Sequence, residues 1–288
     1  ILAYQKALIL TEDKGDILAN IAIAYSRNKD LDNSIKYFNE ARKHNSKNIS
    51  LKLSLSYLYL YKNKYEEAWD LFESRLQNTK FFTNEYNKDI ISYILKNKKD
   101  FNKKDRVLVL REQGVGEEIL FSSLYLDLIN YSDNITIESD KRLIGIFERS
   151  FNKKIFVEDG KFSKHIKDLK NFDTVIFAGS LSKKFRKEKN DFPKIKYLLS
   201  DKERARQVSQ LSVFNNNKLK VGLSWKSVVS IYGKLKSLNL IDFKKIFKKD
   251  RQIFNLQYGN VKSDIKEISD ENYNIYSFDK INLFDDID

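Results

Sequence analysis

A glycine-containing turn followed by two carboxylates is the first group of residues that could do chemistry. Residues 111–118 read REQGVGEE, so Gly114 and Gly116 precede Glu117 and Glu118. Glycine lets a backbone turn and approach a ligand closely, and the free amides at the start of a helix favour an anion or a polar oxygen. A structural role is the alternative, because carboxylates in the first turn of a helix also complement its dipole.

A second group of polar and basic residues follows the apolar stretch at 219–225. Its members are Ser224, Trp225, Lys226, Lys236 and Ser237, with Lys234 in the same loop. Lysines bind phosphate groups as point charges, so this composition suits a diphosphate. An ordinary solvated loop between a strand and a helix explains the same composition, and the residues alone leave both interpretations open.

A third group lies in the segment NLQYG at residues 255–259. Gln257 and Tyr258 stand beside Gly259 after another apolar stretch, where they could contact a base edge or a ribose. The simpler interpretation is that Tyr258 covers the edge of a sheet.

Short apolar stretches predict the strands that would position these groups. The predicted strands are 106–110, 134–138, 154–157, 174–178, 219–225, 252–256 and 274–278. Helical patterns between them cover 118–130, 141–150, 202–211, 240–248 and 261–269. Strands alternating with helices predict parallel sheets of the Rossmann kind, which bind ligands at the carboxyl ends of their strands. Gly114, Gly179 and Gly259 each follow such a strand end.

The first part of the chain has a different period. Tyr4, Phe38 and Phe72 recur every 34 residues, the spacing typical of tetratricopeptide (TPR) helix pairs. The pattern predicts helices at 16–27, with Asp16 as its cap, and at 31–44, 49–61 and 65–77, with a further helix at 84–97. The predicted fold class is therefore α plus α/β, with N-terminal TPR repeats before a pair of Rossmann-like domains.

The predicted domains follow from these two periods. Residues 1–80 form TPR repeats, 81–100 a helical cap or connector, and 101–214 a first Rossmann-like domain. After a linker at 215–218, residues 218–288 form part of a second Rossmann-like domain.

Composition excludes several classes of function. The chain has 288 residues, no cysteine and two histidines, His44 and His165, which lack the spacing of zinc ligands, so we predict no metal site. The net charge of +13 comes from scattered lysines, which favours a solvated surface over nucleic-acid binding. No apolar run approaches the roughly 20 residues that span a bilayer, so we expect no membrane span and a cytoplasmic protein.

The motifs together resemble a known family. TPR units followed by REQGVGEEILFSSL, IESDKRLIGIFERSF, VGLSWKS and FNLQYGNV are similar to bacterial TPR-containing glycosyltransferase-like proteins of the GT-B type. These are related to the heptosyltransferase and O-GlcNAc transferase groups, and the resemblance covers nearly the whole chain. It implies metal-independent transfer of a sugar, with a nucleotide-sugar donor as co-substrate and no other cofactor.

The resemblance also implies roles for single residues. Glu117 stands where relatives have an aspartate that is a candidate general base, and the longer side chain needs a backbone shift to serve. Lys236 corresponds to a basic residue that neutralises the departing diphosphate, and Gln257 is expected near the nucleotide. Donor contacts are further expected from Gly114, Gly116, Ser224, Trp225, Lys226, Ser237, Tyr258 and Gly259.

Two departures from the family pattern concern the ends of the sequence. The chain starts within a repeat, and residues 218–288 are fewer than the roughly 120–150 of a GT-B C-terminal half. We therefore expect a fragment cut at both ends and inactive or nearly so. The alternative is a non-catalytic module in which the TPR groove binds a peptide or protein partner and the α/β part is structural. The change from Asp to Glu at Glu117 and the missing part of the donor pocket favour this alternative.

Overall fold

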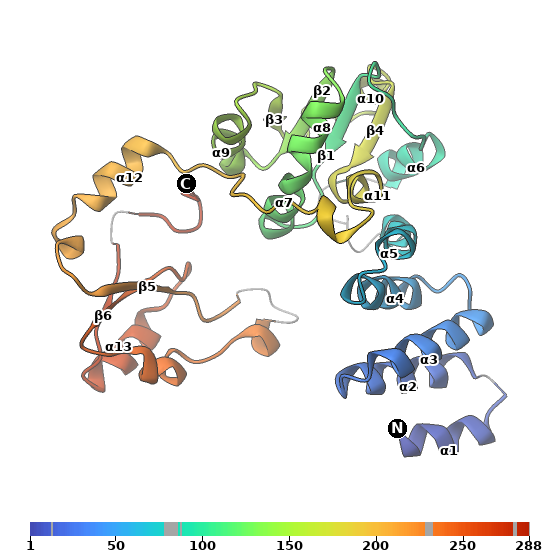
Figure 1. Cartoon of the computed structure of the whole chain (residues 1–288), viewed down its shortest axis with the longest axis horizontal. Helices are drawn as coiled ribbons and strands as arrows, with labels where there is room; N and C mark the ends of the chain where they lie inside the picture. The colour runs from blue at the N-terminus through green and yellow to red at the C-terminus, as the bar shows by residue number, and fades with distance from the viewer. Residues whose placement is uncertain (13, 78–85, 87, 228–232, 279–280, 288) are drawn as a thin grey trace. The chain divides into compact units, whose positions relative to one another are not determined.

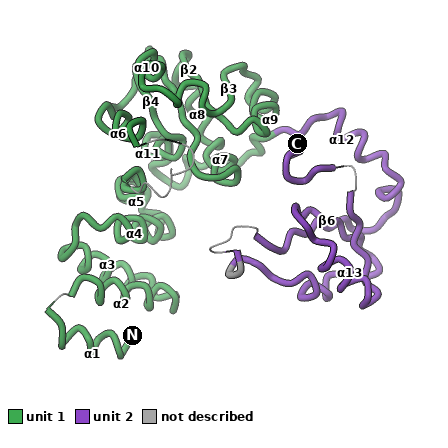
Figure 2. Tube along the Cα trace, turned by 180° about the vertical axis from the view of Figure 1, so that it is seen from behind, with its two compact units in different colours: residues 1–198 green, residues 199–288 purple. Residues whose placement is uncertain are grey.

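The chain folds into two compact units of helices and parallel strands. The computed structural model describes residues 1–12, 14–77, 86, 88–227, 233–278 and 281–287 (Figure 1). The first unit comprises residues 1–198 and the second residues 199–288 (Figure 2). The finer division into repeats, connector and two Rossmann-like domains stays a prediction. Among the described residues, no helix is both long enough and apolar enough to cross a bilayer.

Within the described residues, the first unit begins with a series of α-helices, drawn in blue to teal in Figure 1. They are α1 (Leu2–Leu10), α2 (Gly15–Arg27), α3 (Leu31–His44), α4 (Ile49–Tyr61) and α5 (Tyr65–Phe72), and the 3-10 turn η1 (Glu73–Gln77) continues α5. The predicted helices 31–44 and 49–61 are confirmed at both ends. The prediction that Asp16 caps α2 is wrong: α2 already begins at Gly15, so Lys14 is its N-cap and Asp16 lies in the first turn.

Small residues allow these helices to approach one another closely. Ala22 of α2 and Ala41 of α3 are fully buried, and they pack with Phe38 and with leucines of α2 and α4. The hydroxyl of Ser34 donates to the carbonyl oxygen of Ala22 at 2.8 Å, which satisfies a polar group inside this contact.

A four-stranded parallel sheet forms the centre of the rest of the first unit. Its strands are β1 (Val107–Leu110), β2 (Ile135–Ser139), β3 (Phe156–Glu158) and β4 (Thr174–Phe177), in the order β3-β2-β1-β4. Val107 pairs with Ile135 on one side and with Thr174 on the other. The four predicted strands are thus confirmed. The chain runs from β1 to β2 and β3 on one side of β1 and then crosses to β4 on its other side. The carboxyl ends of β1 and β4 therefore form a topological switch point, where such sheets commonly bind ligands.

Helices and turns surround this sheet. They are α6 (Lys88–Lys96), α7 (Val115–Phe121), η3 (Ser122–Leu124), α8 (Tyr125–Tyr131), α9 (Lys141–Phe151), α10 (Ile166–Leu169), η4 (Ala178–Leu181), α11 (Ser182–Phe185) and η5 (Lys189–Asp191). The single helix predicted at 118–130 is wrong, because the 3-10 turn η3 separates α7 from α8. Of the helix predicted at 84–97, residues 84, 85 and 87 lie outside the described residues, and α6 accounts for most of the remainder.

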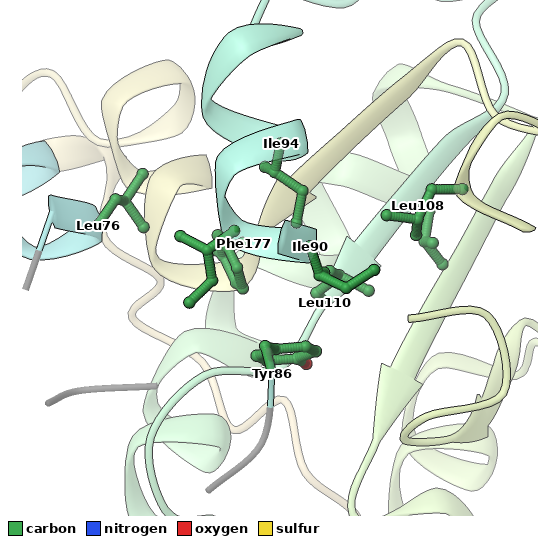
Figure 3. Packing of buried hydrophobic residues seen from close by; sticks show 9 residues of the cluster. Leu76, Tyr86, Ile90, Ile94, Leu108, Leu110 and Phe177 are labelled. Carbon is green, nitrogen blue, oxygen red and sulfur yellow. The ribbon is translucent and has the colours of Figure 1, made fainter. Parts of the chain in front are cut away.

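The core of the first unit joins the end of the N-terminal helices to the sheet. Figure 3 shows Leu76 of η1 packed in one cluster with Ile90 and Ile94 of α6 and with Leu108 and Leu110 of β1. A separate contact lies at α5, where the indole nitrogen of Trp69 donates to the carbonyl oxygen of Arg186 at 2.6 Å. The end of the N-terminal helices is therefore anchored to the α/β part by the apolar packing of η1 and by a buried hydrogen bond from α5.

The second unit contains a three-stranded parallel sheet. Its elements are α12 (Lys202–Ser209), η6 (Ser212–Phe214), β5 (Leu219–Leu223), η7 (Gly233–Lys236), η8 (Leu240–Ile246), β6 (Arg251–Asn255), α13 (Lys262–Asp270) and β7 (Ile275–Tyr276), with strand order β5-β6-β7. The three strands predicted here are confirmed. The helix predicted at 240–248 is present over Leu240–Ile246, as the 3-10 helix η8, which begins with a capping box between Asn239 and Asp242.

Candidate functional site

The loop after β1 places the first predicted group at the carboxyl end of that strand. Gly114 is the N-cap of α7, and a Cβ at Gly116 would meet no atom within 4 Å. Glu117 is exposed in the first turn of α7. Gln113 has a φ of 64°, the left-handed conformation that a sharp turn between the strand and the helix requires. Glu117 is thus a solvent-facing carboxylate on a tightly turned loop.

A buried ion pair fills the switch point beside this loop. Nε and Nη2 of Arg75 donate to the two carboxylate oxygens of Glu112 at 2.7 and 2.8 Å, and the two side chains are 1% and 0% exposed. The amide of Gly179, after β4, also donates to Glu112. A Cβ at Gly179 would lie 2.5 Å from a Glu112 oxygen, so only glycine fits there. The protein's own side chains therefore occupy the crevice between β1 and β4.

Tyr57 of α4 lies near the same charges. Its side chain is 52% exposed, and its ring lies 6.2 Å from that of Phe72. Partial burial raises the pKa of the Tyr57 hydroxyl, and the negative charges of Glu112 and Glu117 raise it further, against an opposing effect of Arg75. An aromatic hydroxyl from the N-terminal helices thus stands within electrostatic range of the exposed Glu117.

Glu118, the second carboxylate of the motif, turns inward. Its carboxylate accepts from Nε of Arg111 at 2.9 Å and from the amide of Asp140 at 3.1 Å. Burial raises the pKa of Glu118 to about 7, although Arg111 opposes the shift. Arg111 also reaches Asp159 after β3, at 3.0 Å. Glu118 thus helps to join the strand-end loops of β1, β2 and β3, while its neighbour Glu117 remains free to meet solvent.

In the second unit, Gln257 joins the loops that follow β5 and β6. Its side-chain oxygen accepts from the amides of Trp225 and Lys226 at 2.9 and 2.8 Å and from the hydroxyl of Ser224 at 3.0 Å. Its side-chain nitrogen, Nε2, donates to the carbonyl oxygen of Tyr258 at 3.0 Å. Gln257 is 1% exposed, so the structure uses it to hold the two loops together.

Asp264 holds the side chains of Trp225 and Lys226. The indole nitrogen and the ammonium group each donate to the same Asp264 oxygen at 2.7 Å. Burial acts to raise the pKa of Asp264, but the hydrogen bonds from Lys226 and Trp225 outweigh it and lower the pKa below its ordinary value. The positive charge of Lys226 is therefore partly neutralised inside the protein.

The remaining predicted residues lie around this pair of loops. Ser237 donates to the carbonyl oxygen of Gly233 and accepts from the amide of Ser227 at 2.9 Å, which brings residues 236–237 back to the end of β5. Lys236 is exposed. Gly259 turns with a φ of 90°, next to the half-buried Tyr258. Residues 228–232 and the side chain of Lys234 lie outside the described part of the chain.

The structure thus assembles two groups, one in each unit. The second unit brings the predicted residues between Ser224 and Gly259 to the carboxyl ends of β5 and β6, while Gly114, Gly116 and Glu117 belong to the first unit. Sequence reasoning missed Tyr57, Arg75 and Glu112. Only Glu112 had a signal, because it lies inside the REQG segment. No family model matches this chain, and a search of curated proteins found no match either.

Proposed function

We propose that this protein is a cytoplasmic glycosyltransferase of the GT-B type, and that it binds a nucleotide-sugar donor at the carboxyl ends of β5 and β6. The observation that carries the proposal is the pair of loops tied by Gln257. Neighbouring parallel strands end together there, with Lys226 and the exposed Lys236 beside them. This edge of an α/β sheet is where phosphate-bearing ligands usually bind.

The N-terminal helices support the TPR part of the proposal. Helices α2 and α4 begin at Gly15 and Ile49, and α3 and α5 begin at Leu31 and Tyr65, so both starts recur with the 34-residue period. The small residues at the helix contacts are buried, as this kind of repeat requires.

In the proposed reaction, the exposed carboxylate of Glu117 accepts the proton of an acceptor hydroxyl. The hydroxyl oxygen then forms a bond to the anomeric carbon of the donor sugar, and the bond from that carbon to the diphosphate oxygen breaks. The electron pair leaves with the nucleoside diphosphate, whose charge is stabilised by Lys236. Gln257 acts on the donor indirectly, by fixing the loop amides of Trp225 and Lys226.

Thermal unfolding in the presence of nucleoside diphosphates tests the donor site. Uridine, guanosine and adenosine diphosphates are compared, and one of them should stabilise the protein by about 2.7 kcal/mol at 100 times its dissociation constant. Lys236→Ala should weaken the effect, whereas Lys248→Ala, which removes another exposed lysine of the second unit, should leave it unchanged. Absence of stabilisation by all three nucleotides contradicts the proposal.

A second candidate function is protein binding by the N-terminal helices. Ile23 of α2 and Tyr57 and Tyr61 of α4 are large side chains with 40%, 52% and 75% of their surface exposed. Aromatic side chains of this kind anchor many protein interfaces. This candidate gains support if no nucleotide stabilises the protein while a Tyr57→Ala/Tyr61→Ala variant loses a partner that the wild-type protein retains.

A further inference from the structure

A basic pocket lies in the first unit beside β4 and α11, and it shares no lining residue with the proposed donor site. Its volume is 270 Å³, and Phe101, Ile176 and Ser180 form part of its wall. Five of its lining residues are lysines: Lys98, Lys99, Lys183, Lys184 and Lys187. So many ammonium groups around one small pocket repel one another unless something negative lies among them.

The protein neutralises only part of this charge. Lys98 pairs with Glu73, and Lys183 pairs with Asp70 at 2.7 Å. Two carboxylates, Glu73 and Asp100, line the pocket with the five lysines. Asp70 lies outside the lining, and Asp173, whose charge acts on Lys99, is already paired with Arg106. Within the described part of the chain, Lys99, Lys184 and Lys187 form no ion pair. The pocket therefore keeps an excess of positive charge.

Lys184 is held in place before any ligand arrives. Its ammonium group donates to the carbonyl oxygen of Phe101 at 3.1 Å and lies 4.7 and 4.4 Å from the ring centroids of Phe101 and Tyr131. These contacts fix a side chain that otherwise has many rotamers, which lowers the entropic cost of binding. An ammonium group has three donors, and only one of them is used by the carbonyl oxygen.

We propose that this pocket binds a small phosphate-bearing anion. Phosphate oxygens accept several charge-assisted hydrogen bonds, and lysines bind them as point charges. Since a water molecule takes up about 30 Å³ in the liquid, the pocket has room for more than a single phosphate ion. A diphosphate or a phosphorylated small molecule fits both the volume and the charge, and the apolar surface of Ile176 and Phe101 suits its non-phosphate part.

Acylation of lysines by an amine-reactive reagent tests the proposal at single residues. The full chain is labelled with and without inorganic pyrophosphate at constant ionic strength, and each lysine is followed by mass spectrometry. Pyrophosphate should slow the labelling of Lys99, Lys184 and Lys187 several-fold and leave the exposed Lys141 and Lys167 unchanged. Equal slowing at all five lysines indicates only a counterion atmosphere and overturns the proposal, as does no slowing at the pocket.

Matched double variants separate local binding from net charge. In Lys99→Ala/Lys187→Ala, the pyrophosphate concentration that protects Lys184 should be at least about tenfold higher than in the wild type, because two charge-assisted hydrogen bonds are lost. Lys141→Ala/Lys167→Ala removes the same net charge from the same unit and should bind as the wild-type protein does. Equal affinities of the two double variants overturn the proposal, and their thermal unfolding shows whether both are folded.

The same labelling distinguishes this pocket from the proposed donor site. Protection of Lys226 or Lys236 without protection of Lys99 and Lys187 overturns the proposal that the pocket binds an anion and is compatible with the proposed donor site. Protection of the pocket lysines alone supports the pocket and gives no support to the donor site.

Discussion

Arg75 of η1 and Glu112 of the loop after β1 form a fully buried, bidentate ion pair. We predict that Arg75→Ala lowers the free energy of unfolding by about 3–5 kcal/mol, because it leaves the Glu112 charge buried and unpaired. Arg75→Met/Glu112→Leu should cost less than Arg75→Ala alone, because Glu112 is removed together with its partner, and Glu73, the other carboxylate paired with Arg75, keeps its ion pair with Lys98. Urea denaturation measures both variants. Asp32→Asn breaks the exposed pair with Lys62 and should change little.

The stability of the protein should depend on the ionisation of Glu118. Burial raises the pKa of its carboxyl group to about 7 from an ordinary value of 4.5. The folded state therefore holds the proton more tightly than the unfolded chain, so the contribution of Glu118 is complete below about pH 4.5 and is lost as the pH rises toward 7.

Glu118→Gln, which imitates the protonated side chain, isolates this dependence. In urea titrations, the unfolding free energy of the wild type minus that of the variant should decrease as the pH is raised from 5 to 8. Glu117→Gln, on the exposed neighbour, should give the wild-type profile. A constant difference across this range would show that Glu118 is already ionised at pH 5.

Asp140 should stabilise α9, and this stabilisation should be lost at low pH. Its side chain caps the helix by accepting from the amide of Arg142 at 3.0 Å, and the hydrogen bonds from Arg142 lower its pKa to about 2. Asp140→Ala should cost about 1 kcal/mol at pH 7. Because the folded-state pKa is depressed, the contribution of the charge is present above about pH 3.8 and is lost as the pH falls through 2. Asp140→Asn keeps a cap and should lack the pH dependence.

Two glycines should respond to alanine in opposite ways. A Cβ at Gly179 would meet Glu112 at 2.5 Å and Arg75 at 2.9 Å, so Gly179→Ala should destabilise the protein by about 1–3 kcal/mol. Gly116 lies in α7 with open space around it, and Gly116→Ala should stabilise by about 0.5–1 kcal/mol. Thermal unfolding compares the two. Destabilisation by Gly116→Ala would contradict the open surroundings of that residue.

Gln257→Leu should loosen the second unit. The substitution leaves the amides of Trp225 and Lys226 without their acceptor, at a cost of about 2–4 kcal/mol. Hydrogen exchange followed by mass spectrometry should show faster exchange at the ends of β5 and β6. Gln210→Leu, on an exposed residue of the same unit, should leave these rates unchanged, and unchanged rates in Gln257→Leu would argue against the tie between the loops.

The periodicity of the sequence predicted most of the elements because each period reports a local preference. Continuous apolar stretches such as 106–110 marked buried parallel strands, and the 34-residue period marked α3 and α4. Periodicity did not decide the type of helix at 240–246, because Leu240, Ile241 and Phe243 can all face a core in either an α-helix or a 3-10 helix over so short a segment. The choice there depends on local capping.

The candidate site was less accessible from sequence because its contacts join distant residues. Arg75 and Glu112 are 37 positions apart, and nothing in a single sequence indicates that they pair. Gln257 was identified as a residue of the strand-end loop, but its hydrogen-bond partners 31 to 33 positions earlier decide what its side chain does. The residue types indicated which strand ends matter, and the fold determined which side chains remain available to a ligand.

The hydrogen bond from Trp69 to Arg186 limits how this protein can be cut and recombined. A chimera that replaced all five N-terminal helices would leave the Arg186 carbonyl oxygen without its donor and uncover the surface on which Trp69 packs. A junction placed before Tyr65 would keep α5 together with the α/β part that it contacts. Helix α5 is therefore structurally part of the α/β region, and only helices α1 to α4 can be exchanged without removing this hydrogen bond.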